Sequence, residues 1–282
     1  MPRSDGLSKA TSLAPAVKLG FDGRVDAIHR ALPVEAAVGI IYAPTPYAVM
    51  MASPVDLEDF VYGFSLTEGV ITNAGDIRAV AIVNDPKGFK VSVTLAPDRL
   101  RTHLARGRNL AGRTGCGVCG IEDIDQLPFA PPRPRHSQRL SLRAAKRAIH
   151  NLDAHLPLGD ATRATHAAAW CDKDGDIKTV REDVGRHNAL DKLIGALLRS
   201  GADPAQGFIV ITSRCSFEMV EKAAAFGVAA LVSISAPTSL ALERAHAHGM
   251  TLLAIARADG AMLFTDAAGV AQDLLLEGAT TE

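Results

Sequence analysis

The chain has 282 residues, 48% of them hydrophobic and 22% charged, and its 30 basic and 31 acidic side chains leave a net charge of −1. This composition excludes a disordered chain and a small disulfide-dependent scaffold, and the balanced charge gives no indication of a nucleic-acid partner. The apolar runs are far shorter than the roughly 18 residues of a membrane span, the first residues lack a secretory signal, and four cysteines are too few for a disulfide framework. We therefore expect a cytoplasmic protein with no membrane partner.

The first part of the chain is predicted to be rich in β-strands. Residues 1–20 mix Ser, Lys, Pro and Ala and predict a solvated, disordered tail, followed by an N-terminal α+β portion over residues 21–125. Ser53 and Pro54 have the residue types of a helix N-cap and first helical position, so a helix is expected to start there and to end at Gly69. Strand patterns occur at 38–42, 47–51, 77–83 and 89–95.

A segment over residues 126–139 with four prolines predicts a connector between two portions of the chain. Beyond it, residues 140–282 alternate short apolar strands with helices of about ten residues, which is typical of a parallel sheet covered on both faces. The sequence therefore predicts an α/β fold. The expected strands are 166–171, 177–182, 207–212, 229–234 and 251–256, and the expected helices are 141–151, 186–200, 216–226 and 238–248.

The most specific local pattern is a pair of cysteines, Cys116 and Cys119, among glycines at 112, 115, 117 and 120. Such a pair has four productive uses: half of a zinc site, a redox dithiol, part of an iron–sulfur site, or a sulfur-carrying nucleophile with a neighbouring thiol. The other two cysteines are isolated, so no four-ligand zinc site is completed, and the glycines disfavour the helix that follows a thioredoxin-type pair. We expect a mobile loop whose thiol can reach outward, with no metal bound.

Charge is distributed unevenly around this loop. Between Arg99 and His150 there are eleven Arg and Lys residues (99, 101, 106, 108, 113, 133, 135, 139, 143, 146 and 147) and three acids (122, 123 and 125), a local charge of +8. A basic environment lowers the pKa of a thiol and attracts anions, so a phosphate-bearing ligand would suit it.

Two further segments place polar side chains where strands end and helices begin. Residues 181–192 (REDVGRHNALDK) include Arg186 and His187 at the start of a predicted helix, and Asp183 is placed to cap that helix. Ser213 and Arg214 follow an apolar strand and precede the next helix, where ligands of parallel sheets bind.

Taken together, residues 115–120 (GCGVCG), 182–192 and 217–222 (FEMVEK) resemble the formate dehydrogenase accessory sulfurtransferase family, FdhD/NarQ. Residues 49–54 and 63–69 also match, and the similarity extends from about residue 34 to 265. The resemblance implies a cytidine-deaminase-like three-layer α/β core with a mixed, largely parallel sheet, a smaller N-terminal β-rich portion, and a homodimer.

The same resemblance implies a function in the maturation of molybdenum enzymes. A cysteine desulfurase would transfer sulfane sulfur to Cys116, forming a persulfide, with Cys119 as its companion. The sulfurtransferase would then bind the bis(molybdopterin guanine dinucleotide) cofactor, bis-MGD, sulfurate its molybdenum, and deliver it to apo formate dehydrogenase. The implied cofactor-binding turn consists of Ile255, Ala256, Arg257, Ala258, Asp259 and Gly260.

Two other functions remain open from the sequence. The chain could be a non-catalytic chaperone of the molybdenum cofactor, whose cysteines only position the ligand. The implied fold also allows a zinc-dependent nucleotide deaminase, although the Glu that such a site requires is missing near His150 and His166.

Overall fold

A computed structural model describes residues 4–106 and 140–271 of the chain. The predicted sulfur-carrying residues Cys116 and Cys119 and the predicted connector 126–139 lie outside the described residues. In the described part, no helix is long and apolar enough to cross a membrane.

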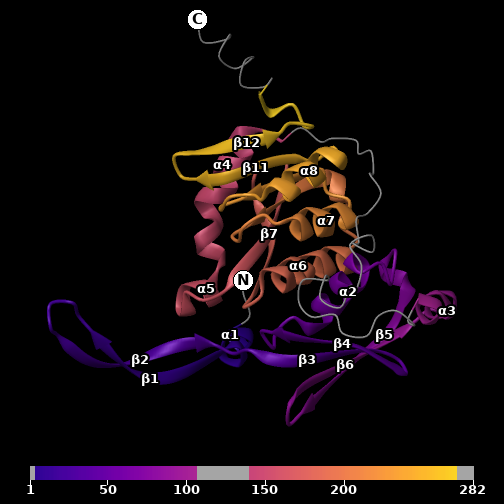
Figure 1. The fold of residues 1–282 in the computed structure, drawn as a ribbon, viewed down its shortest axis with the longest axis horizontal. Helices are drawn as coiled ribbons and strands as arrows, with labels where there is room; N and C mark the ends of the chain where they lie inside the picture. The colour runs from indigo at the N-terminus through magenta and orange to yellow at the C-terminus, as the bar shows by residue number, and fades with distance from the viewer. Residues whose placement is uncertain (1–3, 107–139, 272–282) are drawn as a thin grey trace, which may run out of the picture.

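The centre of the molecule is a six-stranded sheet with the strand order β12-β11-β10-β9-β7-β8 (Figure 1). The three strands β9, β10 and β11 are parallel; β7 pairs antiparallel with both β9 and β8, and β12 pairs antiparallel with β11, so the sheet is mixed and the α/β class is confirmed. The bounds are β7 His166–Asp172, β8 Ile177–Asp183, β9 Gly207–Ile211, β10 Ala230–Ser233, β11 Thr251–Arg257 and β12 Gly260–Thr265.

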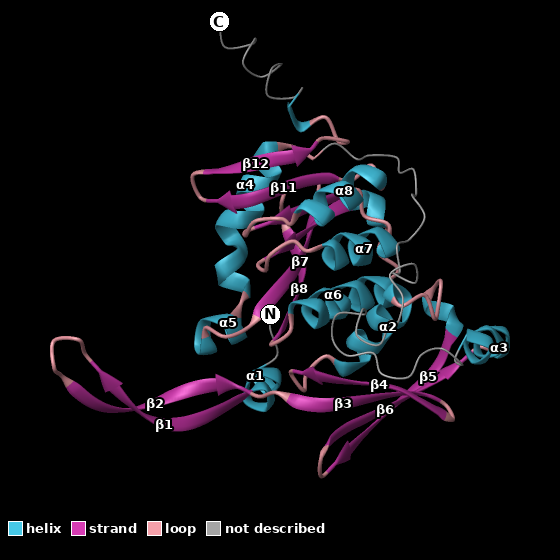
Figure 2. Cartoon of the chain, in the orientation of Figure 1, coloured by secondary structure: helices cyan, strands magenta, loops and turns pink. Residues whose placement is uncertain are grey.

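Helices cover both faces of this sheet (Figure 2). On one face α6 (Arg186–Ser200), α7 (Phe217–Phe226) and α8 (Ser239–Ala247) enclose the largest apolar core. On the other face lies α4 (Leu142–Leu152), which is followed by the short helix α5 (Pro157–Thr162). Helix α6 contributes Leu190, Leu193, Ile194 and Leu197, all of them buried, to this core.

The N-terminal portion forms a second sheet with the order β4-β3-β6-β5, whose inner face packs against α2 (Leu57–Thr67). Helix α2 in turn crosses α6, so this portion is joined to the central sheet through a pair of helices. The remaining elements of the sheet and its border are β3 Ala36–Tyr42, β4 Thr45–Ala52, β5 Ile77–Asp85, β6 Gly88–Leu95 and α3 Pro97–Arg106. Short 3₁₀ turns lie at Ala74–Asp76, Asp153–His155 and Pro204–Gln206.

Two N-terminal predictions differ from the structure. Instead of a tail over residues 1–20, the chain forms α1 (Ser4–Ala10) and a hairpin of β1 (Thr11–Leu19) and β2 (Val25–Pro33) that projects from the body (Figure 1). Helix α2 begins after Asp56 rather than after Ser53. The Ser53 N–H instead donates to the Asp183 carboxylate (2.9 Å), a contact between the two portions of the chain.

Candidate functional site

The candidate site lies at the edge of the central sheet where β8 and the parallel strands β9, β10 and β11 end. Strand β7 begins at the same edge, because it runs antiparallel to β8 and β9, and His166 pairs there with Asp183. Loops that follow β9 and β10 are held together: the Cys215 N–H donates to the Ala236 carbonyl (3.2 Å). The carboxyl ends of parallel strands are the usual ligand-binding edge of an α/β sheet.

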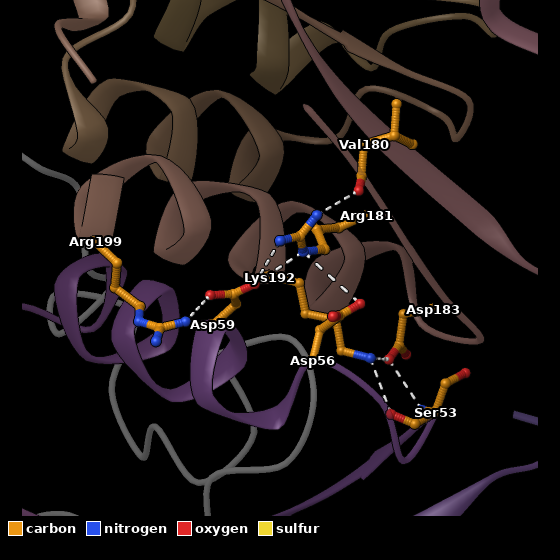
Figure 3. Close-up of polar contacts among 8 residues, drawn as sticks. All are labelled: Ser53, Asp56, Asp59, Val180, Arg181, Asp183, Lys192 and Arg199. Atoms are coloured by element: carbon orange, nitrogen blue, oxygen red, sulfur yellow. Dashed lines mark hydrogen bonds and ion pairs between the residues drawn. The ribbon is translucent and has the colours of Figure 1, made fainter. Parts of the chain in front are cut away.

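Most of the charged residues in 181–192 hold the two portions of the chain together. Asp183 and Lys192 form an ion pair (2.6 Å) in which neither side chain is exposed, and Lys192 also donates to the Ser53 carbonyl (2.9 Å; Figure 3). Arg181 and Arg199 both bind the buried carboxylate of Asp59 on α2 (Figure 3). The predicted capping role of Asp183 is wrong in this respect, since the N-cap of α6 is Gly185.

Other members of the segment are also engaged in structural contacts. Glu182 accepts from the Leu158 and Gly159 N–H groups at the start of α5 (2.9 and 2.6 Å). Asp191, fully buried, binds Lys222 (2.8 Å) and the Thr67 hydroxyl (2.8 Å), which connects α6, α7 and α2. These contacts account for Glu182 and Asp191, so no ligand is needed to explain the two acidic residues.

Arg186 and His187 are the first two residues of α6 and lie at its N-terminal end. The Arg186 Nε and the His187 Nε2 atoms are buried, yet neither has a hydrogen-bond partner among the described residues. His187 Nε2 lies 3.9 Å from the Glu218 carboxylate, beyond hydrogen-bonding distance. Burial of an unsatisfied donor or acceptor costs about 1–3 kcal/mol, so such atoms are typical of places where a ligand completes the contacts.

The electrostatics of this end are set by burial and by positive charge. Burial, followed by the charges of Lys222 and Arg186, lowers the pKa of His187 to about 3. Burial, followed by the charges of Arg186 and Arg214, lowers the pKa of the half-buried His166. Both imidazoles are therefore neutral near pH 7, and the positive potential comes from Arg186 and Arg214, since Lys222 is paired with Asp191.

The predicted turn 255–260 lies on the same edge. The Ile255 N–H donates to the Ser235 carbonyl (3.2 Å), which joins the turn to the loop that also contacts Cys215. Ile255 has φ 52°, in the left-handed region, where a β-branched side chain is strained, and the register with β12 shifts here. Strained backbone of this kind clusters at functional sites.

The structure thus brings Arg186, His187 and Arg214 together and places the 255–260 turn on the same edge. Within the turn, the Ala256 side chain is buried in the core, whereas Arg257 and the three residues after it are exposed. Ser213 is buried and its hydroxyl donates to the Arg214 carbonyl (3.1 Å), so it is engaged locally. Sequence reasoning missed His166, because its position beside the site follows from the pairing of β7 with β8 and not from a motif.

Comparisons with known proteins agree with the predicted family. Residues 33–271 match the FdhD/NarQ family. The sulfur carrier protein FdhD of Xanthomonas euvesicatoria pv. vesicatoria is 45% identical over 87% of this chain and 88% of its own length, and that of Burkholderia cenocepacia is 43% identical over 84% and 88%. A crystal structure of a protein assigned as a formate dehydrogenase accessory protein, from Desulfotalea psychrophila, matches with a TM-score of 0.73 and 26% identity over 91% of this chain and 97% of that one.

Proposed function

We propose that this chain, which belongs to the FdhD/NarQ family, is a sulfur carrier that serves a formate dehydrogenase. The resemblance predicted from its motifs is confirmed by the family match and by relatives of 43–45% identity named as sulfur carriers. The main support for this function is that these relatives are named as sulfur carrier proteins. The charged edge of the central sheet supports a phosphate-bearing substrate.

In the proposed reaction the Cys116 thiolate attacks the terminal sulfur of a persulfide on a cysteine desulfurase. An S–S bond forms at Cys116, the S–S bond of the donor breaks, and the donor thiolate leaves, so no external oxidant or reductant is needed. In the release step the Cys119 thiolate attacks the Cys116 sulfur; a Cys116–Cys119 disulfide forms and the terminal sulfur leaves as sulfide. The dithiol itself supplies the two electrons.

The proposed sulfur acceptor is the molybdenum of bis-MGD, bound as a substrate. Two guanine dinucleotide arms carry several phosphates, which suit Arg186, Arg214 and Arg257 at the edge of the sheet. The buried atoms of Arg186 and His187 that have no partner among the described residues support a ligand at this place. We further propose that the protein acts in the cytoplasm, where thiols remain reduced.

A homodimer is also proposed, on the basis of the projecting hairpin. Its register places Leu13, Val17, Leu19 and Val25 on one face, and these side chains are 61–73% exposed. The opposite face contacts α5 near the base of the hairpin, where Arg30 donates to the Thr162 carbonyl (3.4 Å). An isolated two-stranded hairpin is marginally stable in water, so an apolar face of this kind favours a permanent partner.

A second copy is the partner that is present whenever the chain is made. Each large side chain buries roughly 60–120 Å², so the four on one hairpin face contribute about 240–480 Å². Two hairpins in a symmetric dimer would bury about 500–950 Å², so neighbouring surface must add to them to reach the roughly 1,000 Å² of a specific interface.

The test of the sulfur-carrier function is activation of formate dehydrogenase in cells whose own copy of this protein is deleted. We expect wild type to restore activity and Cys116→Ala to restore none, while Cys215→Ser, at a buried thiol, serves as the matched control. Full activity with Cys116→Ala would contradict the assignment of the carrier. A non-catalytic chaperone is the alternative, and it differs in never bearing the sulfur itself.

A further inference from the structure

Strand β12 is the outermost strand of the central sheet (Figure 2). It pairs antiparallel with β11, and no described strand pairs with its other side, the β12 edge. Alternate residues of an edge strand direct their N–H and C=O groups away from the sheet, and a second strand can satisfy such a row of groups. The β12 edge therefore has the chemistry to accept an extended segment.

The other edge strands of the described sheets are protected against such pairing, whereas β12 is not. Proteins block free edges with charged residues or with proline. Each of β1, β2, β4, β5 and β8 contains at least one of these, at Pro15, Asp26, Pro46, Arg78 and Lys178. Strand β12 has the sequence GAMLFT, which contains neither. Register shifts occur in the pairing of β4, β5, β8 and β12 alike, so they do not set β12 apart.

Two large apolar side chains of β12 are exposed. Met262 is 56% exposed and Leu263 is 38% exposed, and both are in regular register with β11. Because successive side chains of a strand point to opposite faces of the sheet, an added strand would border one of them on each face. A methionine side chain is flexible enough to pack against partners of different shapes. The β12 edge is therefore apolar on both faces of the sheet.

A second copy of this chain is a poor match for the β12 edge. Two copies paired through β12 would bury four of these side chains, which at roughly 60–120 Å² each give about 240–480 Å². A stable and specific interface needs roughly 1,000 Å². A short segment of another protein instead gains its affinity from main-chain hydrogen bonds, so a small area suits a partner that binds and then leaves.

The position of β12 indicates which protein supplies the segment. Strand β12 begins at Gly260, the last residue of the turn 255–260 at the candidate site, and Arg257, Ala258 and Asp259 of this turn are exposed. A segment paired with β12 would therefore lie beside the place where the proposed cofactor is bound. The enzyme that receives the cofactor has to approach this place.

We propose that the β12 edge is the docking site for an extended apolar segment of the client formate dehydrogenase, which adds to the central sheet as a further strand. The identity of the client rests on the proposed function. Main-chain hydrogen bonds along β12 and the side chains of Met262 and Leu263 make the contact. The added strand holds the client beside the turn 255–260 while the cofactor is transferred.

Hydrogen exchange measured by mass spectrometry tests the docking site on the full chain, with formate dehydrogenase apoenzyme purified from cells that lack this protein. We expect the amides of residues 260–265 to exchange more slowly when the apoenzyme is added, while those of the edge strand β5 are unchanged. Unchanged exchange in β12 would overturn the site. Slower exchange that depends on the concentration of this chain alone would assign the β12 edge to a second copy and overturn the client segment.

Met262→Lys introduces the kind of charge that natural edge strands use against pairing. We expect this variant to bind the apoenzyme about tenfold more weakly or worse, measured by biolayer interferometry, because its ammonium group would lose water on docking. Val83→Lys on β5 is the matched control, since Val83 is 57% exposed, and it should bind like wild type. Equal affinities of wild type and Met262→Lys would overturn the proposal.

Failure of the docking site is distinguishable from failure of the sulfur-carrier function. Loading of Cys116 by a cysteine desulfurase does not involve β12, so Met262→Lys is expected to gain a sulfur atom as wild type does. Normal loading together with normal binding of the apoenzyme by Met262→Lys would contradict the docking site alone. A wild type that gains no sulfur would contradict the carrier function alone.

Discussion

Lys192 is a charged residue with no exposed side-chain surface, held by Asp183 and the Ser53 carbonyl between the two portions of the chain. We predict that Lys192→Met lowers the free energy of unfolding by about 3–5 kcal/mol, because it leaves the Asp183 carboxylate buried without a counter-charge. Urea unfolding measures the change. The matched control is Lys178→Met, whose half-exposed ion pair with Asp172 contributes at most about 1 kcal/mol. An equal loss in both variants would contradict this interpretation.

His187 should make stability depend on pH. Its pKa falls from 6.5 to about 3 on folding, first by burial and then by the charges of Lys222 and Arg186, with Glu218 also nearby. The unfolded chain therefore takes up a proton below about pH 6.5 that the folded chain does not. Stability is lost as the pH falls, by about 1.4 kcal/mol per pH unit from this group.

The measurement is urea unfolding of wild type and His187→Gln at a series of pH values between about 6.5 and about 4.5. The difference between the two proteins isolates this histidine from the carboxylates that titrate in the same range. We expect the stability of wild type to fall more steeply than that of His187→Gln. Parallel curves would show that the imidazole is protonated equally in the folded and unfolded states.

Individual residues show how far the sequence could predict the site. The residue types in 181–192 correctly marked a place where charged side chains gather, and Arg186 and His187 lie at the candidate site. The role of Asp183 could not be inferred, because its partners Ser53 and Lys192 are set by the docking of the two portions. His166 was missed for a similar reason, since the pairing of β7 with β8 brings it to the site.

Among the elements, the crossing of α2 and α6 depends on two glycines. A Cβ atom at Gly63 would lie 1.8 Å from the Asp191 carbonyl oxygen, and one at Gly195 would lie 1.8 Å from that of Asp59. Both obstacles are backbone atoms of the opposing helix, so they cannot be avoided by a change of rotamer. The two helices touch because these positions carry no side chain.

We predict that Gly195→Ala lowers the free energy of unfolding by about 3 kcal/mol or more, although alanine alone would favour the helix by about 1 kcal/mol. Chemical denaturation gives the value. In the control Gly39→Ala, the added Cβ meets its nearest neighbour at an ordinary 3.7 Å, and the change should be small. A neutral or stabilising Gly195→Ala would mean that the helices separate without cost.

The elements of the C-terminal portion were predictable because each has a strong local pattern. Helix α6 has the predicted bounds, and α7 ends at the predicted residue 226, followed by Gly227 with φ 110°. The β1–β2 hairpin was not predicted, because its apolar residues alternate without a buried partner among the described residues. Residues such as Leu13 and Val17 therefore had the composition of a solvated tail.

At the scale of the whole molecule, the hairpin is predicted to control assembly. Leu19 and Val25 face each other on its open apolar face, so Leu19→Ser combined with Val25→Ser should convert the dimer to a monomer, as measured by light scattering after size exclusion. Lys18 and Asp26 form the neighbouring pair of the hairpin, and their side chains lie on the opposite face. A double substitution of these two residues to serine is the control. A monomeric wild type, or a double variant that remains dimeric, would contradict the proposed interface.

The central claim is that the chain itself carries the sulfur, and intact mass spectrometry after incubation with a cysteine desulfurase and cysteine tests it most directly. Cys171 and Cys215 serve as internal controls, because burial raises the pKa of each thiol to about 12 and leaves it protonated. We predict that wild type gains the mass of one sulfur atom, removable by a thiol reductant, and that Cys116→Ala gains none. An unchanged mass of wild type, or the same gain in Cys116→Ala, would contradict the account.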